Sequence, residues 1–210
     1  GALVCAQPAL AADLLIEEGQ DPVDLSGDRR YDYVQIDGVL RVVGNLTIRA
    51  DVITFGPSAQ VRWCALPGAG ADDGCTRGRN VSLIGRERVT VATSIDLRGG
   101  QGASRPGGSL TVSARSVLLT NDVRTDGSEA PSGRVVLTAS GGHLVTQGIF
   151  APGAPIALTG RDGVSVFGSL RTSPGGERSP SSDPSRPDIP AGPVSVRSGG
   201  GDVVVMDGIS

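Results

Sequence analysis

Val164-Ser-Val-Phe-Gly-Ser-Leu170 contains an alternating apolar pair, Val164 and Val166, and a third apolar residue six positions after the first. Alternating segments this short are typical of strands with one face turned inward, because a helix needs a longer run with a 3.6-residue period. The six-residue spacing recurs in seven places along the chain: Val34 to Leu40, Ile53 to Ala59, Val89 to Ile95, Val117 to Val123, His143 to Ile149, Val164 to Leu170 and Val203 to Ile209.

A further alternating pair precedes most of these copies, so each unit contains three short strands. One unit alone buries almost no apolar surface, but stacked units share a continuous core. We therefore predict an all-β fold, a parallel β-helix (β-solenoid) of about seven three-strand coils, and parallel strands joined in one sense make it right-handed. The preceding pairs are Leu46/Ile48, Val81/Leu83, Leu110/Val112, Val135/Leu137, Ile156/Leu158 and Val194/Val196.

The spacing between units varies because extra residues follow the third strand of some coils. Insertions in this one position place the extra loops along a single edge of the solenoid. We predict an N-terminal arm and lead-in over residues 1–32 and a β-helix domain over residues 33–210. The insertions fall at residues 62–80, 98–108, 126–133 and 173–192.

The composition fits a narrow interior lined by β-branched side chains. Aromatic residues make up only 3% of the chain, and all 19 basic residues are Arg against 22 acidic residues. A basic stripe with interleaved aromatic residues is missing, so nucleic-acid binding is disfavoured. No apolar run reaches the roughly 18 residues that a transmembrane helix requires, so we expect no transmembrane segment.

Two stretches resemble filamentous-haemagglutinin-type adhesins and related bacterial surface β-helix proteins. They are Gly133-Arg-Val-Val-Leu-Thr-Ala-Ser-Gly-Gly-His-Leu-Val-Thr-Gln-Gly148 and Ile156-Ala-Leu-Thr-Gly-Arg-Asp-Gly-Val-Ser-Val-Phe-Gly-Ser-Leu170. The resemblance covers most of residues 33–210 and implies a β-helix that is secreted or displayed on the cell surface. It does not fix a function, since one fold supports many roles.

The chain contains three cysteines, and their pairing would indicate whether the protein is located in an oxidising compartment. Cys64 and Cys75 flank a Gly-rich loop, and a disulfide between them would stabilise that loop by ~2–4 kcal/mol in an oxidising, extracellular setting. A metal pair is the alternative, although no other Cys or His stands near enough in the sequence to complete a zinc site. Cys5 is then a free thiol, an intermolecular bridge or a lipid attachment point, and Val4 stands where lipidation requires a small residue.

Catalytic residues are not evident in the sequence. His143, the only histidine, occupies a position that is apolar in the other copies, so we expect a partly buried structural side chain. Carboxylates such as Asp96 and Asp122 fall in different registers of the repeat and form no obvious row. We therefore expect no enzyme activity, no cofactor and no metal site; a carbohydrate-active β-helix enzyme is the less favoured reading.

Two functions remain open. In the first, copies of the chain assemble end to end into an extracellular fibre by strand addition. The last unit stops at Ser210 with its third strand barely begun, and the arm over residues 1–16 is apolar. Two alternatives predict no fibre: the arm folds back to cap its own chain, or the sequence is a fragment of a longer solenoid. The predicted assembly residues are Ala2, Leu3, Val4, Leu10, Leu14, Leu15, Ile16, Val203, Val205 and Ile209.

In the second function, the chain is an adhesin-type module whose edge loops bind a glycan or a host or cell-surface protein. Exposed aromatic side chains are the usual platforms for sugars, and Trp63 is the one aromatic residue that the sequence marks as such a platform. This scarcity of aromatic residues favours protein recognition over glycan recognition.

Overall fold

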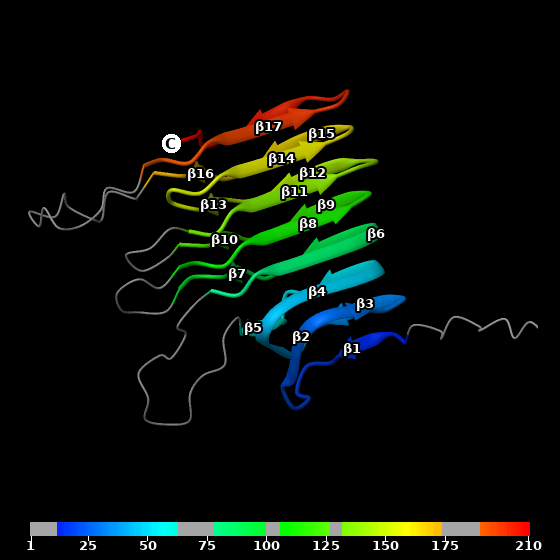
Figure 1. The fold of residues 1–210 in the computed structure, drawn as a ribbon. Coiled ribbons are helices and arrows are strands. Elements are labelled where there is room, and N and C mark those ends of the chain that lie inside the picture. Colours follow the sequence, from blue (N-terminus) through cyan, green and yellow to red (C-terminus); the bar gives the residue numbers. More distant parts are fainter. Residues whose placement is uncertain (1–11, 63–77, 100–105, 127–131, 174–189) are drawn as a thin grey trace, which may run out of the picture.

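The chain is a parallel β-solenoid. The computed structural model describes residues 12–62, 78–99, 106–126, 132–173 and 190–210. In these residues the chain forms eighteen strands, β1 to β18, and no helix. Figure 1 shows the strands stacked in sequence order, from β1 in blue to β17 in red. Each strand pairs in parallel with its equivalent one coil away, as the repeat predicted.

Face 1 of the solenoid is the first strand position of each coil. Three long strands contribute only part of their length to this face. Residues 81–85 of β6 pair with residues 46–50 of β4, which pair in turn with residues 27–30 of β2. The upper strands of this face carry the alternating pairs of the repeat, and both side chains of each pair, such as Leu110 and Val112, are turned inward. Its strands are β17 (Val194–Ser198), β14 (Ile156–Gly160), β11 (Val135–Ala139), β8 (Leu110–Ala114), β6 (Val81–Val91), β4 (Val39–Phe55) and β2 (Val23–Arg30).

Face 2 is the second strand position and follows face 1 along the chain in each coil after the first. The ends of β4 and β6 continue from face 1 into face 2 without a break in the strand. Its separate strands are β18 (Val203–Val205), β15 (Gly163–Val166), β12 (His143–Thr146), β9 (Ser116–Leu119), β3 (Tyr33–Ile36) and β1 (Leu14–Ile16).

Face 3 is the third strand position and forms a separate four-stranded sheet in the upper coils. Lower in the solenoid, β5 pairs with the start of β4, and the start of β4 pairs with the start of β2. The strands of face 3 are β16 (Leu170–Arg171), β13 (Ile149–Phe150), β10 (Val123–Arg124) and β7 (Ile95–Asp96), and β5 covers Gln60–Arg62.

The core consists of inward columns in which equivalent residues stack directly above one another. The predicted column of Val89, Val117, Val164 and Val203 is confirmed by the strand register. So is the column on face 3, which ends in a bridge between Leu170 and Ile209. Most of these side chains are buried, and aliphatic packing replaces a wide aromatic core. The face 3 column contains Ile95, Val123, Ile149, Leu170 and Ile209.

His143 was predicted at a core position, and this is wrong. Leu144 takes that position, in register with Val117 and Val164, whereas His143 is exposed and lies beside Gly163. The corner between β12 and β13 is one residue shorter than its neighbours, so counting six residues back from Ile149 reaches His143. The imidazole packs over Gly163, where an added Cβ would stand 2.4 Å from His143 Cε1.

The coil that contains β5 also differs from the predicted spacing. Leu40 is in register with Val61 rather than with Ala59. A turn at Pro57 and Ser58 adds two residues before β5, and the Ala59 amide donates to the Gly56 carbonyl at 3.2 Å. The six-residue rule therefore fails where a turn is inserted.

Glycines at the corner between face 3 and face 1 allow successive coils to approach closely. A Cβ on Gly108 would stand 2.0 Å from the Arg79 carbonyl oxygen, and one on Gly133 would stand 2.2 Å from the Gly108 carbonyl oxygen. Because only glycine lacks a Cβ, the corner requires it on both coils. The predicted insertions all begin and end at this corner.

The solenoid begins earlier than the predicted boundary at residue 33. β1 pairs with β3, so that Leu14 stacks on Val34 and Ile16 stacks on Ile36. β2 pairs with β4 through Val23 to Arg30. Residues 14–30 therefore belong to the stack and are not a separate lead-in, since they continue its columns.

Ion pairs also connect successive coils. Four such pairs lie among the described residues, and in each the carboxylate belongs to the coil nearer the N-terminus and the guanidinium to the next coil. The side chains are exposed, so each pair contributes at most ~1 kcal/mol. The pairs are Asp24–Arg41, Asp28–Arg49 at 3.3 Å, Asp51–Arg86 at 3.6 Å and Glu87–Arg115 at 4.0 Å.

Within the described part of the chain, no helix is long and apolar enough to cross a membrane.

Candidate functional site

Several predicted site residues lie outside the described part of the chain. They include both cysteines of the predicted disulfide, the third cysteine and the aromatic residue predicted to contact a ligand. The disulfide, the thiol and the aromatic platform therefore remain predictions. The residues concerned are Cys5, Trp63, Cys64 and Cys75, together with Ala2, Leu3, Val4 and Leu10 of the predicted assembly set.

The remaining assembly residues lie at opposite ends of the stack. Leu14, Leu15 and Ile16 form β1 in the first coil, and Val203 and Val205 lie on β18 in the last described coil. The structure therefore does not bring the two groups together within one chain. Leu14 and Ile16 belong to the same two inward columns as Val203 and Val205.

The C-terminal rung, formed by β17, β18 and Ile209, exposes side chains that are buried in the coils beneath it. Val203 is 46% exposed and Ile209 is 56% exposed, whereas Val164 and Leu170 below them are fully buried. In the described residues, β17 pairs only with β14 and β18 only with β15. The rung thus presents apolar side chains and an unpaired backbone edge.

Apolar exposure at this rung also extends to the outer surface. Val204 points outward from β18 and is 44% exposed, and Met206 and Phe167 at the adjoining corner are exposed as well. The Met206 amide donates to Val166, so Met206 lies one coil above Phe167. The equivalent outward position on β15 is Ser165.

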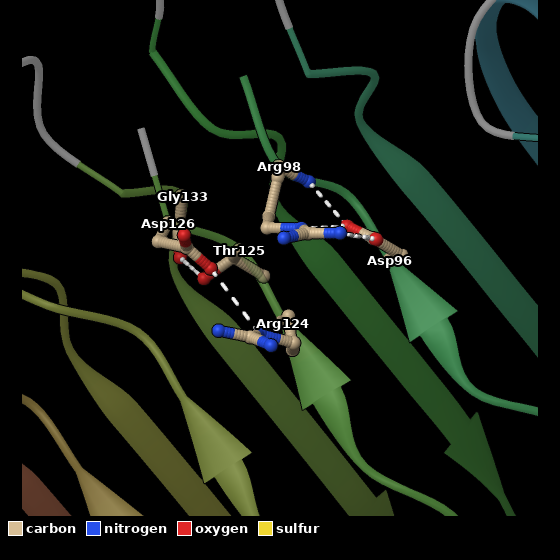
Figure 2. Close-up of polar contacts among 6 residues, drawn as sticks. All are labelled: Asp96, Arg98, Arg124, Thr125, Asp126 and Gly133. Atoms are coloured by element: carbon tan, nitrogen blue, oxygen red, sulfur yellow. Dashed lines mark hydrogen bonds and ion pairs between the residues drawn. The ribbon is translucent and has the colours of Figure 1, made fainter. Parts of the chain in front are cut away.

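Face 3 carries a cluster of charged side chains on its outer surface, which we call the Asp–Arg cluster: Asp96, Arg98, Arg124 and Asp126. Figure 2 shows the Arg98 guanidinium against the Asp96 carboxylate, with Arg124 directed toward Asp126. Arg98 Nε donates to Asp96 Oδ1 at 2.8 Å and Arg98 Nη2 to Asp96 Oδ2 at 2.5 Å. The Arg98 backbone amide also donates to Asp96 Oδ1 at 3.1 Å.

The two carboxylates of the cluster have opposite electrostatic environments. Burial opposes ionisation of Asp96, but the hydrogen bonds and charge of Arg98 outweigh it and lower the pKa of that carboxyl. Burial raises the pKa of Asp126, and the charge of Arg124 offsets this only in part. The pair Arg98–Asp96 is therefore a matched ion pair, whereas Asp126 is poorly solvated.

Arg124 is held by an aromatic ring rather than by a hydrogen bond to Asp126. Its Nε lies 3.7 Å from Asp126 Oδ1, which is beyond hydrogen-bonding distance. Its guanidinium carbon lies 5.4 Å from the centroid of the Phe150 ring, within the range of a cation–π contact. Phe150 comes from β13, one coil above Arg124 on β10.

The outward positions of face 3 form one row, which we call the face 3 row: Asp96, Arg124, Phe150 and Arg171. Strand register places each directly above the one before it. This row was not predicted, although its signal is present in the sequence, because each member directly follows an inward anchor such as Val123 or Ile149. Trp63 is the one aromatic platform predicted from the sequence, whereas Phe167 is 46% exposed and Tyr33 is 38% exposed.

A shallow hollow of about 390 Å³ lies where faces 1 and 2 meet. Its lining includes Glu87, Arg88 and Arg115, and Glu87 is paired with Arg115 at 4.0 Å. Glycoside hydrolysis generally requires two facing carboxyl groups, and Glu87 is the single carboxylate of this lining. Among the described residues, no three His, Cys, Asp or Glu side chains are grouped as a metal ion would require.

Comparison of the chain with protein-family models, with characterised proteins and with solved structures finds no match. The features of the described residues that bear on function are the C-terminal rung and the outer surface of face 3.

Proposed function

We propose that the chain is a structural β-solenoid, secreted or displayed on a cell surface, that associates end to end through its C-terminal rung. The observation that supports this is the exposure of Val203 and Ile209 in columns whose members one coil below, Val164 and Leu170, are fully buried. An apolar rung with an unpaired edge favours the addition of a further strand, because both the core and the backbone gain partners.

The proposed occupant of the rung is the first coil of a second copy. Leu14 and Ile16 belong to the same inward columns as Val203 and Val205, so the second copy's β1 has the spacing that β18 requires. The contact uses different surfaces on the two copies. Such a heterologous contact repeats without closing and yields a head-to-tail polymer.

An extracellular location is part of the same proposal. It is supported by the predicted Cys64–Cys75 disulfide and by the resemblance to bacterial surface β-helix proteins. Both cysteines stand in one insertion between the third strand of one coil and the first strand of the next. Mass spectrometry of unreduced native protein tests the disulfide: two free thiols would remove this support.

Sedimentation velocity across a concentration series of the 210-residue chain tests the assembly. We expect the intact chain to form larger species as its concentration rises, and the variant Val203→Asp/Val205→Asp to remain monomeric. Burial of a carboxylate in the new contact would be strongly unfavourable. Val43→Asp is the matched control, because Val43 is 37% exposed and lies on β4, away from the rung.

Two results would contradict the assembly proposal. One is an intact chain that stays monomeric at every concentration, and the other is a double variant that assembles as the intact chain does. Val204→Asp separates two geometries, because Val204 points outward: stacking on the rung tolerates this change, whereas side-by-side packing through Val204 does not. Circular dichroism of each variant verifies that the fold is intact.

A binding module is the second candidate function. The contact between Arg124 and Phe150 favours it, because it places a charged and an aromatic group together on an exposed sheet. This candidate differs from the adhesin predicted from the sequence, in which the edge loops bind the ligand. Here the sheet surface itself carries the groups.

A further inference from the structure

The face 3 row is a regular array of side chains with a fixed spacing. Asp96, Arg124, Phe150 and Arg171 stand on four consecutive strands, and neighbouring strands are about 4.8 Å apart. Arg124 and Arg171 are therefore separated by two strand steps, about 10 Å, with Phe150 between them. The inward partners of these residues are buried, which fixes the backbone beneath the row.

At the lower end of the row, the charge of the Asp96 carboxylate is neutralised by Arg98. Asp96 accepts hydrogen bonds from both the side chain and the backbone of Arg98, so the pair carries no net charge and little unused hydrogen-bonding capacity. A ligand gains little by displacing Arg98, because the paired hydrogen bonds would have to be broken.

The upper part of the row differs, because its positive charge is less compensated. Arg124 packs over the Phe150 ring and lies 3.7 Å from Asp126 Oδ1, an ion pair without a hydrogen bond, and it donates no side-chain hydrogen bond to any described residue. The side chain of Arg171 is exposed and forms no ion pair within the described part of the chain. A guanidinium presents five N–H donors in a planar fork that matches a carboxylate or a sulfate.

The chemistry of this surface fits a polymer with regularly spaced anions and apolar faces. Arg124 and Arg171 can each bind one acidic group, while the C–H face of a sugar ring packs against Phe150. Single-stranded nucleic acid is a weaker fit, since it requires several aromatic rings on which successive bases stack, and Phe150 is the single aromatic residue of the face 3 row. Because the net charge of −3 provides no general attraction for polyanions, binding would depend on the two arginines of this row.

We propose that the outer surface of β10, β13 and β16 binds an acidic polysaccharide, with its acidic groups on Arg124 and Arg171 and a sugar ring against Phe150. This inference rests on the second candidate function, binding, and is independent of end-to-end assembly. The surface lies on face 3, whereas the proposed assembly uses the C-terminal rung.

Titration of the 210-residue chain with polygalacturonate, followed by calorimetry, tests the site. We expect saturable binding that weakens with added salt, and about a tenfold loss of affinity for each of Arg124→Gln and Arg171→Gln. Arg197→Gln is the matched control, because Arg197 is also exposed but lies on β17 of face 1, and it should bind as the intact chain does. Dextran sulfate and neutral dextran test whether the acidic groups are required. Binding of polygalacturonate or of dextran sulfate, with no binding of neutral dextran, agrees with the proposal.

The proposal is overturned if neither acidic polymer binds, if Arg197→Gln weakens binding as much as Arg171→Gln, or if single-stranded DNA binds as tightly as the acidic polymers. Sedimentation of the same variants separates this site from assembly. We expect Arg124→Gln and Arg171→Gln to sediment as the intact chain does, so that a loss of glycan binding is distinguishable from a loss of polymerisation.

Discussion

Val164 and Val203 occupy successive coils of one inward column, yet Val164 is fully buried whereas Val203 is 46% exposed. The same residue type in the same column therefore has two environments. Burial of a valine side chain is worth about 2 kcal/mol, and truncation at a buried site adds the cost of a cavity. Position along the stack, rather than residue type, determines the contribution of each column member.

Truncation of these two valines should have unequal effects on stability. We expect Val164→Ala to lower the free energy of unfolding by about 2 kcal/mol and Val203→Ala to lower it by about 1 kcal/mol or less. Urea unfolding at low protein concentration measures both, since dilution removes any contribution from assembly. Equal losses in the two variants would mean that the rung is covered in the monomer.

Substitutions at His143 and Leu144 test the register of β12. Because His143 is exposed, His143→Val should change the free energy of unfolding by less than about 0.5 kcal/mol. Leu144→Ala removes a buried side chain and should cost about 2–5 kcal/mol. Urea denaturation followed by circular dichroism compares them, and a larger loss for His143→Val than for Leu144→Ala would restore the predicted register.

The columns could be predicted from sequence because their spacing depends on the strands. The step from Val117 to Val123 or from Val164 to Leu170 is six residues, and Val and Leu at these steps are visible as a pattern. The length of each corner could not be predicted in the same way. Corner residues such as Gln147 and Gly148 follow no regular apolar pattern, so the missing residue before Ile149 left no trace in the sequence.

The candidate site was less predictable than the fold. The face 3 row follows from the register, since Arg124 and Phe150 each come directly after an inward anchor. Which outward groups then contact one another depends on side-chain geometry. Arg98 turns back to Asp96 of its own coil while Arg124 turns to a ring on the next coil, and no sequence spacing distinguishes the two.

Thr146 provides a test of buried polar groups in the core. Its side chain is fully buried, and its Oγ1 has no hydrogen-bond partner in the described structure. The equivalent residues in the adjacent coils are Leu119 and Val166. Because an unpaired buried hydroxyl costs about 1–3 kcal/mol, we expect Thr146→Val to raise the free energy of unfolding by about 1 kcal/mol.

Thr125 is the matched control for Thr146. It is equally buried, but its Oγ1 donates to the Gly133 carbonyl oxygen (Figure 2), and the two oxygens lie 2.8 Å apart. Thr125→Val leaves that carbonyl without its donor, so we expect it to lower the free energy of unfolding by about 1 kcal/mol. The same sign of change in the two variants, measured by urea unfolding, would contradict this account.

The Asp–Arg cluster should give the stability of the chain two opposing dependences on pH. The pKa of Asp96 is lowered in the folded state, so its contribution is present above its ordinary pKa and is lost as the pH falls through the lowered value. The pKa of Asp126 is raised, so its contribution is present below its ordinary pKa and is lost as the pH rises through the raised value.

We expect Asp96→Asn to be less stable than the intact chain at neutral pH, with a difference that shrinks in acid. Asp126→Asn should gain stability relative to the intact chain as the pH rises. Urea unfolding between about pH 3 and pH 7 measures both differences. The same direction of change with pH in the two variants would show that burial and Arg98 do not shift the pKa values of these two carboxyls in opposite directions.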